Sequence, residues 1–270
     1  MWSPEAVGLM LGMGALAGLI AGLFGIGGGM ILVPVVLWVL QIQGGAGSAH
    51  AQHLAVGTSF AVMVFTSFAS AYAQYRKQAI EWPVFRSMAP GMILGVAAGA
   101  QMARYLPNSG MQIFFACFAA VLALRTLLGI RPANMRSLPG RRTLFGMGGL
   151  FGILSSWVGI GGGSLVIPYL SACHVSMHRT VATSAALGWP IALTGALGYW
   201  LAGLTSGAVL PEGSAGFIYL PAVLVLSAAT VLFAPIGVRL AHKLPAGRLK
   251  TGFGILLLLI AAKMLWQVFR

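Results

Sequence analysis

The sequence contains no aspartate and only three glutamates, Glu5, Glu81 and Glu212. All three lie outside the apolar stretches, so no carboxylate is available at membrane depth to bind a metal or Na⁺ or to carry a proton. The only two cysteines, Cys117 and Cys173, stand apart in apolar segments, which fits buried small side chains and not a disulfide framework or metal site. Charged residues are 7% of the 270 residues and hydrophobic residues 59%, whereas a soluble domain is about 25% charged. The chain therefore belongs in a bilayer.

Most of the charged residues are basic. The 16 Lys and Arg give the chain a formal net charge of +13. In a soluble protein this charge would favour nucleic-acid binding. Here the basic residues form short clusters between long apolar stretches, so we expect no nucleic-acid partner. Residues 1–24 lack a basic leader and a cleavage site, which predicts a membrane segment and not a removed signal peptide.

A helix needs about 20 apolar residues to cross a bilayer. The candidate segments are Ala6–Phe24, Met30–Ile42, Leu54–Gln74, Ser87–Ala103, Met111–Ile130, Thr143–Val158, Ser164–Cys173, Thr180–Gly203, Ala215–Val238 and Leu249–Phe269. Two of them, Met30–Ile42 and Ser164–Cys173, are short and follow glycine runs, so each is either a separate crossing or half of a re-entrant hairpin. The fold class predicted is an all-α polytopic membrane protein with glycine-broken or re-entrant helices.

Lys and Arg in short loops mark the cytoplasmic side of a membrane protein. With ten segments, one side receives Arg76, Lys77, Arg86, Arg131, Arg136, Arg141, Arg142, Arg179, Arg239, Lys243, Arg248 and Lys250. The other side receives only Arg104 and Arg270. This asymmetry predicts a multi-pass protein of the inner (plasma) membrane with both termini on the periplasmic or external side.

The two halves of the chain repeat each other. Gly25–Pro34 recurs as Gly159–Pro168 with six identities in ten positions, and Ala55–Ser59 recurs as Thr180–Ser184. We therefore divide the chain into a first repeat (1–130), a basic cytoplasmic linker (131–142) and a second repeat (143–270). Each repeat holds an odd number of crossings, so the second is predicted to be inverted relative to the first. Inverted repeats with broken helices are a recurring architecture of secondary transporters.

The Gly-Ile-Gly-Gly-Gly runs can form a binding site. Glycines break a helix and let backbone approach a ligand closely, and the helix that starts after them presents unpaired N–H groups and a positive dipole end. Pro34 and Pro168 remove a further helical hydrogen bond in each copy. Two such ends meeting near the midplane would bind an anion without a charged side chain. Close helix packing through small residues is the alternative reading.

Neighbouring hydroxyls and an indole can add donors to this site, with Ser155 as a further candidate. The predicted substrate-binding residues are Gly25, Gly27, Gly28, Gly29, Met30, Thr58, Ser59, Ser156, Trp157, Gly159, Gly161, Gly162, Gly163, Ser164, Thr183 and Ser184. For the two Thr-Ser pairs, helix packing is an equally good interpretation.

Two further sets of polar residues each have two possible interpretations. Gln52 and His53, with His50 one turn earlier, form either a proton or anion relay or simply a polar loop end. Arg125 and Lys263 stand at equivalent places in the two repeats. They either extend to the membrane surface or help to attract an anion.

The motif Gly22–Gly29 with Pro34, its second copy ending at Pro168, and Gly57-Thr58-Ser59 resemble the TauE/SafE family of membrane permeases, often called sulfite exporters. The resemblance covers essentially the whole chain. It implies permeation of small sulfur-containing anions such as sulfite or organosulfonates, without ATP. The second copy departs from the first at Ala182, which stands where the first has Gly57.

The sequence thus predicts a secondary transporter, and the alternative is a passive anion channel through the same midplane cavity. We expect no enzyme activity, no cofactor and no bound metal. The expected partners are a small anionic substrate and the lipid bilayer, while the oligomeric state and the direction of transport stay open.

Overall fold

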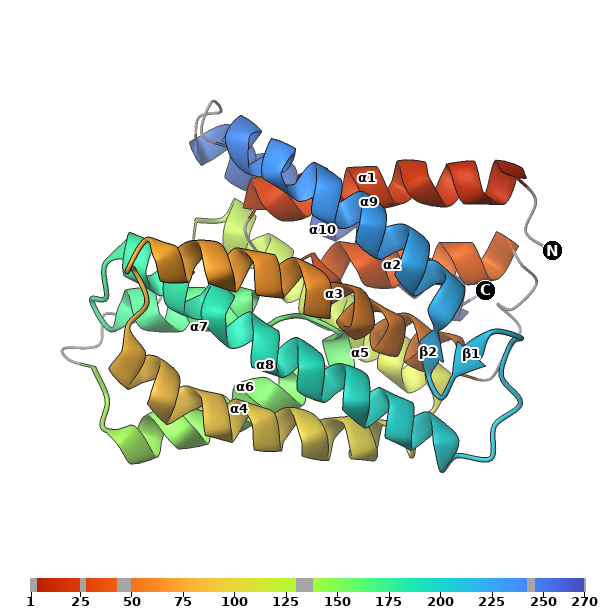
Figure 1. Cartoon of the computed structure of the whole chain (residues 1–270), viewed down its shortest axis with the longest axis horizontal. Coiled ribbons are helices and arrows are strands. Elements are labelled where there is room, and N and C mark those ends of the chain that lie inside the picture. Colours follow the sequence, from red (N-terminus) through yellow and green to blue (C-terminus); the bar gives the residue numbers. More distant parts are fainter. Residues whose placement is uncertain (1–3, 25–27, 43–49, 130–137, 242–245, 270) are drawn as a thin grey trace.

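The computed structural model describes residues 4–24, 28–42, 50–129, 138–241 and 246–269 (Figure 1). In these ranges the chain forms ten helices and one short hairpin, which confirms the predicted all-α membrane fold. The helices are α1 (Pro4–Phe24), α2 (Gly29–Ile42), α3 (Ala51–Arg76), α4 (Trp82–Ala103), α5 (Asn108–Leu127), α6 (Arg141–Val158), α7 (Gly163–Ala172), α8 (Met177–Leu204), α9 (Leu220–Ala241) and α10 (Ala246–Phe269), and the hairpin strands are β1 (Ser214–Ala215) and β2 (Ile218–Tyr219).

The ninth segment was expected to begin five residues too early, and α4 begins at Trp82, five residues before the expected Ser87. Helix was expected from Ala215, but β1 and β2 pair in antiparallel fashion there and α9 begins only at Leu220. Gly213 and Gly216 have φ angles of 83° and 55°, in the left-handed region that glycine adopts without strain. These glycines turn the chain back on itself before the helix starts.

Helices α2 and α7 are too short to cross a membrane alone. They contain 14 and 10 residues, which correspond to roughly 21 Å and 15 Å against a hydrocarbon core of about 30 Å. By contrast, α3, α5, α8 and α9 are long and apolar enough to cross it, by length and composition, in the part of the chain that the structure describes. The chain therefore breaks at both glycine runs, as the sequence predicts.

Helices of one half pack mainly on helices of the other. Helix α1 lies along α9 and α4 lies along α6, while α3 packs on α8 and α5 on α10. The short helices instead pack within their own half, with α2 on α3 and α7 on α8. This pattern is unchanged when the two halves are exchanged, as two structurally equivalent repeats require. The inverted orientation of the second repeat stays a prediction.

The α4–α6 pair shows how close this packing is. A Cβ on Gly91 would collide with the carbonyl oxygen of Phe145, and one on Gly95 with that of Gly149. Because positions 91 and 95 meet positions 145 and 149 in ascending order, the two helices run parallel and begin at the same end of the molecule. Small residues at such positions let membrane helices approach to backbone contact.

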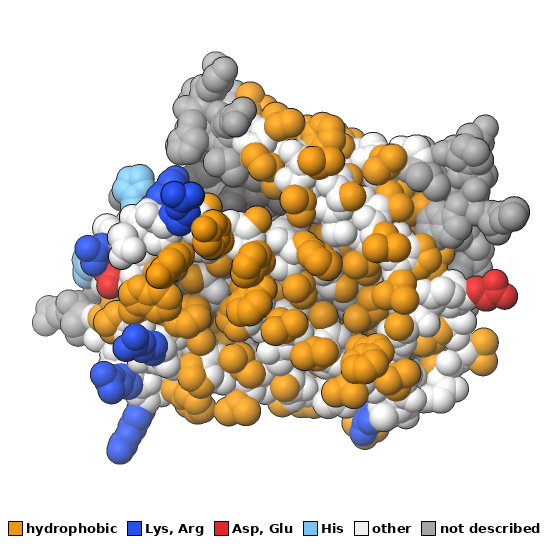
Figure 2. All heavy atoms as spheres, in the orientation of Figure 1, with side chains coloured by type: hydrophobic (Ala, Val, Ile, Leu, Met, Phe, Trp, Pro, Cys, Tyr) orange, Lys and Arg blue, Asp and Glu red, His pale blue; other side chains and the backbone are white. Residues whose placement is uncertain are grey.

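The two ends of the molecule differ in charge. Lys and Arg side chains gather at the end where α4, α6 and α8 begin (left in Figures 1 and 2), and a broad hydrophobic surface separates this end from the other. Helix α1 begins at the opposite end (Figure 1). This separation agrees with the sorting of basic residues made from the sequence.

Candidate functional site

The second glycine run forms a tight turn between α6 and α7. Gly159 ends α6 with a φ of 72°, and its N–H donates to the Ser155 carbonyl over 2.9 Å. Gly162, with a φ of 76°, immediately precedes α7. In the first copy, Gly28 at the equivalent position has a φ of 79° and immediately precedes α2. Gly25 and Gly27 lie outside the described residues.

The two glycine runs are in direct contact. A Cβ on Gly29 would collide with the Gly159 carbonyl oxygen and lie 3.0 Å from the Ile160 Cα. The hydroxyl of Ser59 donates to the Val56 carbonyl over 2.8 Å and to the Gly159 carbonyl over 3.3 Å, which links α3 to the same turn. The structure therefore brings Gly29, Gly159 and Ser59 together, with no space for an anion between Gly29 and Gly159.

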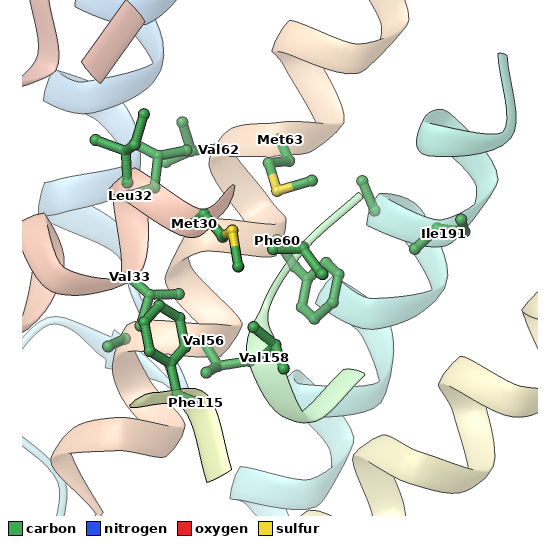
Figure 3. Close-up of a cluster of buried hydrophobic side chains, with 14 of the residues drawn as sticks. Met30, Leu32, Val33, Val56, Phe60, Val62, Met63, Phe115, Val158 and Ile191 are labelled. Atoms are coloured by element: carbon green, nitrogen blue, oxygen red, sulfur yellow. The ribbon is translucent and has the colours of Figure 1, made fainter. Parts of the chain in front are cut away.

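The surroundings of this contact are apolar. Met30, Phe60, Met63, Val158 and Ile191 are all fully buried or nearly so, and Figure 3 shows them around the segment that joins α6 to α7. Gly161 and Gly162 pack against this layer, because a Cβ on either would lie within 3.0 Å of the Met63 or Ile191 side chain. An anion here would be removed from water, so any polar donor facing it would act in a medium of low dielectric constant.

Such donors exist at the start of α7. The Gly162 carbonyl accepts from the N–H groups of Leu165 and Val166, but no side chain caps the helix. The hydroxyls of Ser155 and Ser164 are both buried and have no hydrogen-bond partner. Buried polar groups are nearly always hydrogen-bonded, so two unpartnered hydroxyls on either side of one turn indicate a missing partner.

Ser156 and Trp157 have hydrogen-bond partners in α6 and α4, respectively. The Ser156 hydroxyl donates to the Ile153 carbonyl over 2.7 Å, and the Trp157 indole N–H donates to the Gly99 carbonyl over 3.0 Å. Their polar atoms are therefore occupied by protein groups. Of the serines near this turn, Ser155 and Ser164 have the free hydroxyls, and of these only Ser164 is in the predicted binding set.

The two threonines of the Thr-Ser pairs have matching structural roles. Thr58 accepts a hydrogen bond of 2.9 Å from the N–H of Tyr219, which immediately precedes α9. Thr183 accepts one of 2.9 Å from the N–H of Glu81, which immediately precedes α4. Each threonine thus holds the start of a helix of the other half. These bonds support the packing interpretation for the threonines, and Ser184 is likewise buried.

The difference between Gly57 and Ala182 follows from the same arrangement. A Cβ on Gly57 would collide with the Phe217 carbonyl oxygen, because the β1–β2 hairpin approaches α3 there. Ala182 of the second copy instead lies near the segment before α4, where the described residues form no hairpin, and it packs with Ile80 and Ala186 in a small buried cluster. The hairpin therefore explains why only the first copy needs glycine.

Comparison with known proteins agrees with this architecture. The sequence model described as "Sulfite exporter TauE/SafE" matches residues 10–264. The chain belongs to this family. A probable membrane transporter protein of Haemophilus influenzae is 35% identical over 95% of this chain and 97% of its own length. TauE/SafE proteins are membrane transporters, and the chain is a multi-pass member of this family.

More distant relatives carry the same description. Probable membrane transporter proteins of Methanocaldococcus jannaschii and Bacillus subtilis are 22% and 26% identical to this chain. The first alignment covers 90% of this chain and 89% of the relative, and the second 87% and 91%. No solved structure matches the chain significantly.

Gln52 and His53 lie in the first turn of α3 in this TauE/SafE protein and are fully buried, so a polar loop end does not describe them. His53 Nε2 donates to the Ala103 carbonyl over 2.8 Å, and both side-chain polar atoms of Gln52 lack partners. His50 packs edge-on against His53, with ring centroids 5.3 Å apart. Among the described residues, no three His, Cys, Asp or Glu side chains are grouped to hold a metal ion.

Arg125 and Lys263 lie away from the glycine turns. Arg125 is in the last turn of α5 and partly exposed. Lys263 is exposed and lines a cavity of about 390 Å³ between α1, α2 and α10, together with Trp38 and Gln41. The structure does not bring either basic residue to the contact between the glycine runs.

Sequence reasoning missed two residues beside the turn. Tyr199 is completely buried, and its hydroxyl donates to the Ser156 carbonyl over 2.9 Å. Met63 contacts both glycine runs, since a Cβ on Gly29 or Gly161 would press on its side chain. Both stand in apolar stretches without any motif, so only the packing of α3 and α8 reveals them.

Proposed function

We propose that this TauE/SafE protein is a secondary transporter of a small sulfur-containing anion, such as sulfite or an organosulfonate, in the inner membrane. The pair of unpartnered hydroxyls, Ser155 and Ser164, at the uncapped start of α7 is the observation that supports this proposal best. The family description names sulfite export, which supports the substrate class.

The proposed site uses no charged side chain. The anion accepts hydrogen bonds from the Ser155 and Ser164 hydroxyls and from the first N–H groups of α7. The positive end of the α7 dipole adds to this attraction. Because the surrounding side chains are apolar, the bound anion would be largely dehydrated. This favours a small anion whose oxygens can take several donors at once.

The contact between Gly29 and Gly159 favours a transporter over an open channel. Backbone touches backbone there, so this point is closed in the structure. Passage of an anion along the turns requires the two glycine runs to separate. A transporter that separates them once per cycle gives saturable flux, whereas a channel gives flux that rises with concentration without limit.

Replacement of Ser155 and Ser164 by alanine tests the site. Each variant is reconstituted in liposomes, and uptake of sulfite, thiosulfate, sulfoacetate and taurine is measured against concentration. A hydrogen bond to a charged group contributes about 1.5–3 kcal/mol, so each substitution is expected to raise the KM roughly tenfold or more. Thermal stability should stay equal or rise, because an unpartnered buried hydroxyl is removed.

Ser227→Ala is the matched control, since its hydroxyl donates to the Leu224 carbonyl of its own helix on an exposed surface. This variant should transport like the wild type. If Ser155→Ala and Ser164→Ala transport with an unchanged KM, the hydroxyls are not part of the site. If the folded wild-type protein shows no saturable flux of any of the four anions, the substrate class is wrong.

A further inference from the structure

A second cavity lies at the end of the molecule where α4 and α6 begin side by side. Its volume is about 580 Å³, and Arg86 of α4 faces Arg141 and Arg142 of α6 across it. These two helices run parallel in backbone contact, with Gly91 opposite Phe145, so Arg141 at the start of α6 lies about level with Ser87 and next to Arg86. The three guanidinium groups are therefore positioned by the most closely packed helix pair that joins the two halves.

In the part of the chain that the structure describes, no carboxylate forms a salt bridge with these arginines. Glu81 is the nearest acidic residue in sequence, and its carboxylate already pairs with Arg179 over 2.6 Å. Glu5 and Glu212 belong to other ends of the fold, on α1 and beside β1. Among the described residues, that pair with Arg179 is the only salt bridge. The cavity thus carries three uncompensated positive charges.

The position of Arg141 and Arg142 makes the cavity more positive. They occupy the first turn of α6, which follows Gly140 and has no side-chain cap. A cation in the first turn of a helix opposes the helix dipole and weakens the helix unless an anion is present. The sequence therefore places its arginines where a bound anion would relieve an unfavourable interaction.

The rest of the lining is apolar and half open to the surface. Trp82 and Phe145 are 40% and 44% exposed, and Pro90 completes this side. Tryptophan and other aromatic side chains favour the membrane interface, and basic pockets between helices at the cytoplasmic face bind anionic lipid headgroups. A free inorganic anion would use the arginines alone, whereas a phospholipid would use both the arginines and the apolar side.

We propose that this cavity binds the phosphate group of an anionic phospholipid from the cytoplasmic leaflet, with the acyl chains along Trp82 and Phe145. The lipid bridges α4 of the first half and α6 of the second. Its binding is independent of which anion the protein transports.

The test compares two double variants that remove the same charge. Arg141→Gln/Arg142→Gln alters the cavity, whereas Arg76→Gln/Lys77→Gln alters the end of α3 outside it. Protein in a neutral detergent is titrated with phosphatidylglycerol or phosphatidylcholine of the same acyl chains, and bound lipid is counted by native mass spectrometry. We expect the wild type to prefer phosphatidylglycerol roughly 100-fold and the cavity variant to lose about 30-fold of this preference.

The Arg76→Gln/Lys77→Gln variant should keep the preference, and an equal loss in both variants would overturn the proposal. Without lipid, the cavity variant should melt at the same temperature as the wild type or higher, because charges opposing the α6 dipole are removed. A third titration uses inorganic phosphate. If phosphate stabilises the wild type as much as phosphatidylglycerol does, and through the same arginines, the ligand is a free anion and the lipid proposal is wrong.

Discussion

Thr58 and Thr183 show that single residues of the two repeats do equivalent work in the fold. Each accepts a hydrogen bond from the backbone N–H just before a helix of the other half, α9 or α4, and both bonds measure 2.9 Å. Pro221 and Pro83 stand at the same position after these N–H groups. A repeated sequence motif here predicts a repeated contact, although the motif alone does not reveal that the contact is structural.

We expect Thr58→Val and Thr183→Val each to lower the free energy of unfolding by about 1–3 kcal/mol, because a buried donor loses its acceptor while side-chain volume is kept. The measurement is thermal unfolding of the purified protein in detergent. Thr126→Val is the control, since the Thr126 hydroxyl donates to the Leu122 carbonyl of its own helix. Equal effects in all three variants would show that the hydrogen bonds between the halves stabilise the protein no more than a hydrogen bond within one helix.

At the scale of helices, glycine decides both where the chain breaks and where helices touch. The breaks at the two Gly-Ile-Gly-Gly-Gly runs could be predicted, because glycine runs next to short apolar segments have a local signature. The contacts could not, because Gly91 and Gly95 resemble Gly146 in sequence but differ in what faces them. Gly95 meets the backbone of Gly149, whereas nothing lies within 4 Å of a Cβ on Gly146.

Gly95→Ala is expected to lower the melting temperature, since the new Cβ would force α4 away from α6. Overpacking of this kind costs about 1–3 kcal/mol. Gly146→Ala makes the same chemical change on α6 and should be neutral or stabilising, because it adds a better helix former in open space. The difference between the two melting temperatures isolates the helix contact. A Gly95→Ala variant as stable as Gly146→Ala would contradict the close approach.

The candidate site, like the helix packing, could be predicted from the sequence only in part. The glycine runs follow from the repeat and from the chemistry of helix ends, and Ser164 was predicted as a hydroxyl directly after the second run. The distinction between Ser155 and Ser156 does not, because both lie on α6 and either hydroxyl could donate to a carbonyl of its own helix, yet only that of Ser156 does so. The hairpin between β1 and β2 was missed because its two-residue strands have no alternating pattern.

For the molecule as a whole, the separation of charge predicts its orientation in the membrane. We expect the end with Arg142 to face the cytoplasm and the end with Glu212 to face outward. In a background with Cys117→Ala and Cys173→Ala, Glu212→Cys should react with a membrane-impermeant maleimide in intact cells. Arg142→Cys should react only after the membrane is permeabilised. The reverse pattern would invert the proposed topology.

The pairing of α1 with α9 and of α4 with α6 also bears on how the protein is made. During synthesis the first half enters the membrane with the faces of α1 and α4 that pack on α9 and α6 still uncovered, because these partner helices lie in the second half. The native packing of the first half therefore waits for nearly the whole chain to be inserted. A chain that stops after α5 would leave those faces open to lipid, to proteases, or to the same faces of another incomplete chain.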